Sequence, residues 1–466
     1  MAKEFYRGGL SSPPFLFLLL AVLAFWQCAP RPEAERTSVV LVIIDTLGAE
    51  NVGAFAGSFP SPTPRLDRLA DEAVLFRRAY SPAPWTQPSV ASLLTSRLPS
   101  EHGVLRLFDV LAEDRLTLAE VLTQVGYRSG AIVSHRLLSA DLGFGQGFSH
   151  HDDSLAGGHR TITSEAVTAA ALAWLDEQPD GAPFFLLAHY FDPHYVYQHR
   201  PEFDRTSGYG GALVPDMPIW DLRNAGADLS TADVAYLEGL YREEVAATDA
   251  AVGALVDGLV ERALVDRSLL VVTADHGEEI LRRGWLGHTR TLYEELIHVP
   301  LLMRLPGGGA QSFDEPVSLI DVAPTILDLV GVARPEGFAG RSLAGWIRGL
   351  EEPTSQPVRA EVAFDDLTAA AGRAGRKTAF KTAVVDGSYK VIHDLIADRW
   401  ELYDLASDPL EEHNLAADEA AESHPEEPRL RRYLLRWEQA RGELSNPRAK
   451  PSAEALEELR ALGYLR

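Results

Sequence analysis

Three short, almost entirely apolar runs most constrain what this chain can fold into. They are Ser38–Ile44, Phe184–Ala188 and Ser268–Thr273, and β-branched residues are frequent in the first and the last. Runs without polar alternation indicate strands that are buried on both faces, as in a parallel sheet. Amphipathic helical patterns at Ser164–Leu175 and Ala235–Val260 lie between these runs. The alternation predicts an α/β fold with a central, mainly parallel sheet flanked by helices.

The pattern changes after about residue 350. Asp321 followed by Ala323–Val330 predicts one more capped helix. The change is marked by Lys390–His393 and then by a short polar and acidic segment over residues 408–427, for which we expect an exposed loop or helix. We therefore expect a main domain over residues 37–350. A smaller C-terminal α+β subdomain with a helical tail is expected over residues 351–466.

The N-terminal segment predicts export from the cytoplasm. A charged start precedes the apolar run Phe15–Trp26, which is too short to span a bilayer comfortably and is typical of an export signal. The single cysteine, Cys28, follows this run, as in bacterial lipoproteins. Residues 1–28 are thus a cleaved leader, a lipoprotein leader or an uncleaved anchor, followed by a linker over residues 29–36. In each case we expect a periplasmic or cell-envelope protein that contacts the membrane only through its leader.

Charge and cysteine content exclude several classes of function. The chain has 67 acidic and 43 basic residues and a formal net charge of -24, which disfavours nucleic acid as a partner. One cysteine excludes a disulfide framework, a cysteine-based zinc site and a catalytic thiol in the body of the protein.

Polar residues follow each of the three apolar runs. Asp45 and Thr46 follow the first, His189 and the segment Asp192–His194 follow the second, and the segment Asp275–Glu278 follows the third. The carboxyl ends of parallel strands meet at one edge of the sheet, so these groups can converge. A single aspartate after a strand is more often a helix cap. Three such strand ends together indicate a site for a metal or an oxyanion.

A fourth segment contributes a hydroxyl group. Ser81–Ser89 leads into the apolar Val90–Thr95, and Pro88 suits a first helical turn, so Thr86 lies at or just before a helix N-terminus. Such a terminus attracts anions. Next to a divalent cation, the Thr86 hydroxyl could ionise and attack phosphorus or sulfur. The alternative is that Thr86 only caps the helix.

The ordered set of motifs resembles the sulfatase family of the alkaline phosphatase superfamily, over nearly the whole chain after the leader. The segments that carry the resemblance are Ser38–Glu50, Thr86–Thr95, His189–Tyr197, Thr273–Pro300, Glu401–Pro409 and Leu459–Leu465. The resemblance implies a metal-dependent ester hydrolase.

The same resemblance implies roles for individual residues. It assigns one divalent metal ion to Asp45, Thr86, Asp275 and His276. It also implies that His194 contacts the bound oxyanion, that His288 faces the substrate and that Thr86 is the nucleophile. His189 is expected to have a structural role near the end of the sheet.

The chain departs from the family pattern at the nucleophile. Standard sulfatases use Cys-x-Pro-Ser-Arg, or a serine version, whose first residue is oxidised to formylglycine; here the stretch is Thr86–Val90. Oxidation of threonine gives a ketone instead of an aldehyde, and Val90 replaces the arginine that helps to hold the aldehyde hydrate. Thr46 also replaces the second aspartate of the usual pair, which disfavours calcium. One nitrogen and three oxygen ligands favour zinc or manganese, with calcium and magnesium as the other candidates.

Three hypotheses for function follow. The leading one is an exported hydrolase, or phosphotransferase, that acts on phosphate mono- or diesters through Thr86. The second is a sulfuric ester hydrolase in the broad family sense. The third is a catalytically silent surface protein that binds glycans or anions. For either enzyme we expect a small-molecule, glycan or lipid ester as substrate.

Overall fold

The computed structural model describes Met1 and residues 36–57, 60–157, 163–365, 377–416, 424–441 and 446–465. The chain divides into Met1–Arg36 and Thr37–Arg466, and the elements below all belong to the second unit. The predicted export signal with Cys28 lies outside the described residues. Among the described helices, none combines the length and the apolar composition that a bilayer-spanning helix needs.

The predicted central sheet is present and has eight strands in the order β12-β2-β11-β7-β1-β6-β4-β5. The strands β7, β1, β6, β4 and β5 are parallel, and β11 is antiparallel to its neighbours β7 and β2. Their bounds are β1 (Ser38–Ile44), β2 (Val74–Phe76), β4 (Arg128–Val133), β5 (His150–Asp152), β6 (Phe184–Tyr190), β7 (Ser268–Ala274), β11 (Leu301–Arg304) and β12 (Gln311–Phe313). The three apolar runs form β1, β6 and β7, every residue of which is buried.

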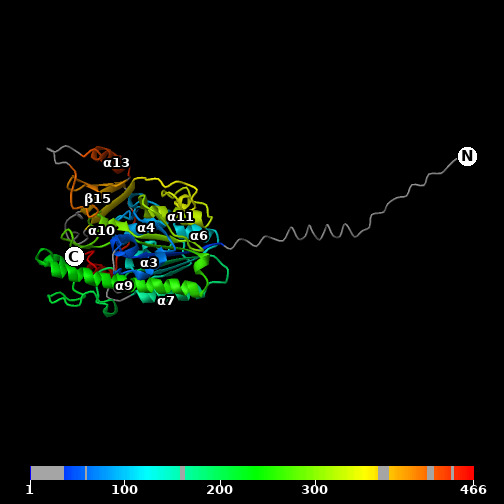
Figure 1. Ribbon diagram of the computed structural model, residues 1–466, viewed down its shortest axis with the longest axis horizontal. Helices are drawn as coiled ribbons and strands as arrows, with labels where there is room; N and C mark the ends of the chain where they lie inside the picture. The colour runs from blue at the N-terminus through cyan, green and yellow to red at the C-terminus, as the bar shows by residue number, and fades with distance from the viewer. Residues whose placement is uncertain are drawn as a thin grey trace. The chain divides into compact units, whose positions relative to one another are not determined.

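Helices cover both faces of this sheet (Figure 1). On one face lie α3 (Pro64–Ala70), α7 (Ser164–Asp176) and the long α9 (Thr231–Glu261). On the other lie α4 (Thr86–Thr95), α6 (Leu118–Gln124) and α11 (Val322–Leu329). The remaining helices of the main domain are α2 (Gly53–Ala56), α5 (Pro99–His102), α8 (Ile219–Ala225), α10 (Glu294–Ile297) and α12 (Ala344–Ile347).

Three smaller sheets complete the fold. One pairs β10 (His298–Val299), β3 (Ala79–Tyr80) and β13 (Val317–Ser318), and another pairs β8 (Glu279–Ile280) with β9 (Leu286–Gly287). The C-terminal part contains an antiparallel sheet on which α13 (Glu427–Ala440) packs, which confirms the α+β subdomain. Its strands are β14 (Val358–Asp365), β15 (Lys377–Asp386), β16 (Tyr389–Asp394) and β17 (Arg399–Asp404). The last helix is α14 (Ala453–Ala461).

The helix predicted after Asp321 is present as α11, but the Asp321 side chain does not cap it. Its carboxylate accepts hydrogen bonds from the backbone N–H groups of Ser318 and Arg341, at 3.0 and 2.9 Å. The aspartate therefore closes the 3-10 turn Leu319–Asp321 that precedes the helix. The sequence pattern alone did not show whether Asp321 would close this 3-10 turn or cap the first turn of α11.

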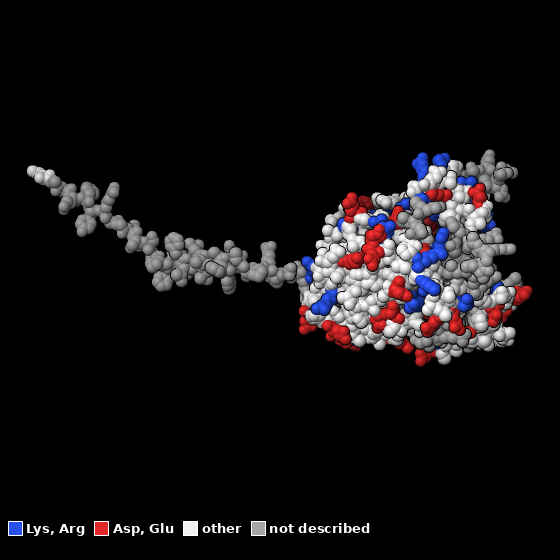
Figure 2. Space-filling view, turned by 180° about the vertical axis from the view of Figure 1, so that it is seen from behind, with Lys and Arg blue, Asp and Glu red and all other residues white. Residues whose placement is uncertain are grey.

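Acidic and basic side chains both reach the surface. On the face shown in Figure 2, acidic residues gather along the lower edge, and basic ones stand among acidic ones elsewhere. This distribution agrees with the strongly negative net charge of the sequence.

A buried lysine of the C-terminal sheet forms an ion pair with a glutamate of the main domain. Lys390 of β16 is fully buried, and its Nζ lies 3.0 Å from Glu294 Oε1 and 2.9 Å from Glu411 Oε1. Burial raises the pKa of Glu411 to about 7, and the ammonium group of Lys390 opposes that rise. The lysine thus compensates two carboxylates that solvent reaches poorly.

We predict that Lys390→Ala lowers the free energy of unfolding by about 3–5 kcal/mol, because the carboxylates lose their buried counter-charge. The deficit should shrink toward pH 5, since Glu411, whose pKa is raised to about 7, binds a proton there. Urea unfolding at pH 5 and pH 8 measures both effects. The double variant Lys390→Met, Glu411→Leu should recover part of the loss. A deficit below 1 kcal/mol at pH 8 would contradict this account.

Candidate functional site

The carboxyl ends of β1 and β7 bring three charged or polar side chains together. Asp45 follows β1, and Asp275 and His276 follow β7; all three are fully buried. The His276 Nε2 atom lies 3.4 Å from Asp45 Oδ1 and 3.5 Å from Asp275 Oδ2. The ligand atoms of the three residues lie within 4.8 Å of one another, as a shared metal ion requires.

Thr86 faces this cluster from the first residue of α4. Its hydroxyl donates to Asp45 Oδ2 over 3.4 Å and lies 3.3 Å from His276 Nε2. The N-cap of the helix is Trp85, so Thr86 does not take the role of a simple cap. Ser89, one turn on, donates to the Asp275 carbonyl at 2.7 Å and ties the helix to the end of β7. The site therefore combines a hydroxyl, a helix N-terminus and two carboxylates.

The cluster is electrostatically incomplete without a cation. The Nδ1–H group of His276 faces the Gly277 carbonyl at 2.9 Å, so Nε2 directs a lone pair at the two carboxylates. Burial, followed by repulsion from Asp275 and Glu278, raises the pKa of Asp45 well above its usual value, and burial raises that of Asp275. In the described part of the chain, Asp45 Oδ1 and Asp275 Oδ2 have no hydrogen-bond partner. A divalent cation would satisfy these atoms, and the donor set fits one.

His194 and His288 lie beside the cluster, and both are buried. The Nδ1–H of His194 donates to the Tyr195 carbonyl at 2.6 Å, and that of His288 donates to Glu278 Oε1 at 3.0 Å. Burial, followed by the charge of His288, lowers the pKa of His194 to about 3. Burial also lowers that of His288, so both rings are neutral in the absence of a bound anion.

Two further histidines lie beside Asp45. The Nε2 atom of His189, on β6, is 3.6 Å from Asp45 Oδ2, and neither ring nitrogen has a hydrogen-bond partner among the described residues. The structure thus places His189 in the buried end of β6, and its expected structural role stays a prediction. His135, just after β4, lies 3.9 Å from the same oxygen and was not predicted. A signal existed, because His135 also follows a buried strand.

Asp192 was a candidate at the end of β6, but its side chain turns away from the site. Its Oδ2 accepts hydrogen bonds from the N–H groups of Thr163 and Ser164 and from the Ser164 hydroxyl. It therefore caps α7, which is the common role of an aspartate after a strand. His194, two residues later, does reach the site.

The C-terminal segment supplies a residue that the sequence did not predict for the site. Tyr464, after α14, is 4% exposed, and its hydroxyl oxygen lies 2.9 Å from His288 Nε2. The Leu459–Leu465 segment carried part of the family resemblance but no chemical role. Nothing local in its sequence indicates where the tyrosine lies.

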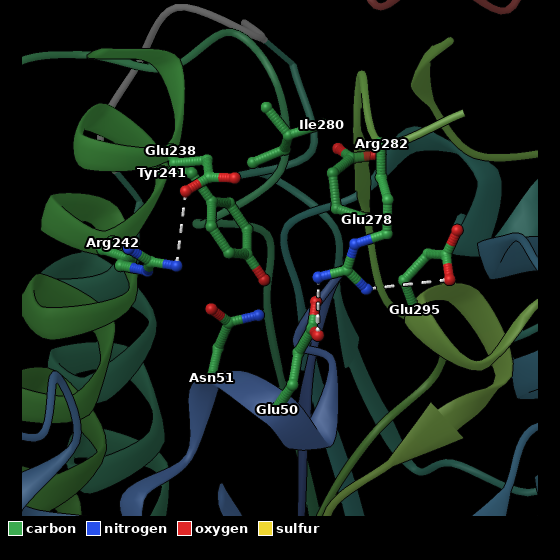
Figure 3. A pocket seen from close by; sticks show the side chains of 9 residues that line it. All are labelled: Glu50, Asn51, Glu238, Tyr241, Arg242, Glu278, Ile280, Arg282 and Glu295. Carbon is green, nitrogen blue, oxygen red and sulfur yellow. Dashed lines mark hydrogen bonds and ion pairs between the residues drawn. The ribbon is translucent and has the colours of Figure 1, made fainter. Parts of the chain in front are cut away.

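A small hollow adjoins the site beside Glu278 (Figure 3). Glu238, Tyr241 and Arg242 of α9 form one wall, and Arg282 bridges Glu50 and Glu295 on the other side. The Tyr241 hydroxyl donates to the Thr46 carbonyl at 2.8 Å, next to Asp45. Through this hydrogen bond, a wall residue of the mixed-charge hollow contacts the residue next to Asp45.

The fold and this site define an ester hydrolase of the alkaline phosphatase-like superfamily. The sulfatase family model matches residues 37–332, and the model described as "N-sulphoglucosamine sulphohydrolase, C-terminal" matches residues 282–436. The chain belongs to the sulfatase family. This confirms the family, the fold and the class of enzyme that the sequence motifs indicated.

Individual relatives are distant. An N-acetylglucosamine-6-O-sulfatase of Bacteroides thetaiotaomicron is 24% identical and covers 72% of this chain and 75% of its own. A Δ4,5-hexuronate-2-O-sulfatase of the same organism is 26% identical over 71% of this chain and 76% of its own. The solved phosphonate monoester hydrolase of Agrobacterium radiobacter has a TM-score of 0.71 at 20% identity, over 89% of this chain and all of that one. At such identity the structural likeness concerns the fold.

We predict that Asp275→Asn weakens metal binding by more than the ~10–100-fold that loss of an outer hydrogen-bond partner causes. In chelator-treated protein the same change should raise the melting temperature, because the buried repulsion with Asp45 is removed. Elemental analysis after dialysis and thermal unfolding measure these two effects. The exposed Asp266, changed to asparagine, is the matched control and should alter neither. Full metal occupancy in Asp275→Asn would place the metal elsewhere.

Proposed function

We propose that the protein hydrolyses phosphate mono- or diesters, or transfers their phosphoryl group to an acceptor alcohol, with Thr86 as the nucleophile. The observation that carries this proposal is the position of the Thr86 hydroxyl. It lies within 3.4 Å of both Asp45 Oδ2 and His276 Nε2, at the N-terminus of α4. A hydroxyl in this place can lose its proton and attack an ester in line.

The residues present allow a balanced two-step reaction. Thr86 Oγ forms a bond to phosphorus as the bond to the leaving oxygen breaks. The proton that Thr86 loses passes to the Nε2 atom of His194 or His288, which are neutral at rest, and from there to the leaving alcohol. Water or an acceptor alcohol then attacks the threonyl phosphate, and Thr86 regains its proton. While His194 or His288 holds this proton, it also stabilises the charge on the non-bridging oxygens.

One divalent ion, held by Asp45, Thr86, Asp275 and His276, would supply Lewis-acid chemistry when bound: it lowers the pKa of the hydroxyl and stabilises negative charge. Zinc and manganese suit one nitrogen and three oxygen donors. The chain's own contribution is to hold these donors at the ends of rigid strands. There, the helix N-terminus adds a positive dipole.

The choice of phosphate over sulfate rests on the chemistry of threonine. An unmodified alkoxide lacks the hydrated aldehyde by which formylglycine enzymes release sulfate by elimination. Val90, which is buried, occupies the place of the arginine that holds such a hydrate. Structural neighbours that are named phosphonate monoester hydrolases support phosphorus as a centre that this fold can accept.

The alternative is a sulfate-ester hydrolase. The names of the curated relatives favour it, since two of them are glycan sulfatases. In both cases we propose that the substrate is a small-molecule, glycan or lipid ester.

Thr86→Ala should retain the fold and most of the metal, because three ligands remain, yet lose nearly all turnover. The loss corresponds to about 4–8 kcal/mol in the barrier. Thr86→Ser should keep measurable activity, since the hydroxyl is preserved. Steady-state kinetics with an aryl phosphate measures this series. The exposed Thr354, changed to alanine, serves as control. Turnover by Thr86→Ala at a tenth of the native rate would eliminate the threonine as nucleophile.

The native enzyme should prefer phosphate esters over sulfate esters of the same alcohol. Purified protein, loaded with each metal in turn, is assayed on matched aryl phosphate, phosphodiester, phosphonate and sulfate esters. A hundredfold faster turnover of the aryl sulfate would overturn the phosphate assignment and leave the sulfate-ester alternative.

We also propose that the protein is exported and that Cys28 carries lipid, on the basis of the charged start and the apolar run before it. Cys28→Ser should then move the protein from the membrane fraction to the soluble fraction of lysed cells. Unchanged membrane retention would instead favour an uncleaved anchor. Protein found only in the cytoplasm would contradict export.

A further inference from the structure

The C-terminal segment carries one side chain into the catalytic site. After α14, Gly463 takes a φ of 78°, which turns the chain so that Tyr464 enters the cluster of histidines. The Tyr464 hydroxyl oxygen lies 2.9 Å from His288 Nε2, 3.3 Å from His194 Nε2 and 3.5 Å from His135 Nε2. A substrate oxygen near His194 and His288 would therefore lie next to this hydroxyl.

The tip of the segment is fastened to α8. The Trp220 indole N–H donates to the Leu465 carbonyl at 3.0 Å, and the Arg223 guanidinium donates to the Gly463 carbonyl at 2.8 Å. A side chain at position 463 would come within 2.6 Å of Arg223 and 2.8 Å of Ile219, so the close approach requires glycine. The backbone next to Tyr464 is therefore fixed on both sides.

The stretch that leads into α14, residues 446–449, is also held by hydrogen bonds and an ion pair. The Asn446 amide donates to the His102 carbonyl at 3.0 Å, and the Ala449 N–H donates to the Phe108 carbonyl at 2.9 Å. Arg448 pairs with Asp109 at 3.0 Å. The chain is thus held both before and after α14. The position of Tyr464 therefore does not depend on a single contact.

The donor and acceptor roles of His194 and His288 indicate what the Tyr464 hydroxyl can do. The Nδ1 atoms of His194 and His288 face the Tyr195 carbonyl and Glu278, so their Nε2 atoms are acceptors while the rings are neutral. Non-bridging oxygens of an ester also only accept. The Tyr464 O–H can therefore supply a hydrogen-bond donor beside these two Nε2 atoms.

His135 fixes the direction of this donor. Its Nδ1 accepts a hydrogen bond from the Leu137 N–H at 3.0 Å, so its Nε2 carries the hydrogen and points at the Tyr464 oxygen. The phenol therefore accepts from His135 and directs its own hydrogen toward His288 and the space that the ester would occupy.

We propose that Tyr464 is a substrate-contacting residue, whose hydroxyl donates a hydrogen bond to a non-bridging oxygen of the bound ester, and that the segment Ala453–Leu465 is thus part of the active site. The proposal rests on the ester-hydrolase chemistry of Thr86, but it holds for phosphate and sulfate esters alike.

The test compares Tyr464→Phe with Tyr433→Phe, which alters a tyrosine on α13, in metal-loaded full-length protein. Loss of one oriented donor should lower kcat about 10²–10³-fold on the better of the matched aryl phosphate and sulfate. Metal content and melting temperature should stay unchanged. Tyr433→Phe should retain native kinetics.

Anion binding supplies a readout that does not depend on turnover. Competition with inorganic phosphate and with inorganic sulfate should be at least tenfold weaker in Tyr464→Phe than in native protein. Thr86→Ala, in contrast, should lose turnover and still bind the anion in a calorimetric titration. If sulfate esters are the better substrates, the phosphate proposal fails while the role of Tyr464 is still tested.

Two results would overturn the proposal. Activity and anion binding of Tyr464→Phe within twofold of native would show that the hydroxyl contributes nothing to the bound ester. A gain of activity would show that the tyrosine obstructs the site, in which case the C-terminal segment is an inhibitory plug.

Discussion

Two carboxylates that solvent does not reach, Asp45 and Asp275, lie at adjoining strand ends with the lone pair of His276 between them. This arrangement is unfavourable by itself, since burial and mutual repulsion both disfavour the charged forms. A bound cation converts it into an attraction. The rest of the architecture can be understood as a means of holding these atoms close together, because free side chains would move apart.

The order of strands supplies that restraint. β1 lies between β6 and β7 in a buried parallel sheet, so the groups that follow these three strands are held at one edge. α4 then presents Thr86 from a different part of the sequence. Each of these groups is attached to an element that is buried on most sides, which keeps their atoms in position without help from a ligand.

The sequence predicted those parts whose information is local. The bounds of β1 match the apolar run, and Asp45, Asp275 and His276 follow their strands as expected. His135 was missed because its strand begins with a polar stretch and has a short apolar part. Tyr464 could not be placed, because its position depends on contacts with distant residues of α8 and not on its neighbours in sequence.

The central position of β1 has a consequence for how the chain reaches its native state. Val39 pairs with Phe185 on one side and with Leu269 on the other, both of which are synthesised much later. β1, in the middle of the sheet, is therefore synthesised before the two strands with which it pairs. Until they follow, this apolar segment has no strand partner along either edge. A nascent chain of this kind is a natural client for chaperones that shield such segments until β7 has been made.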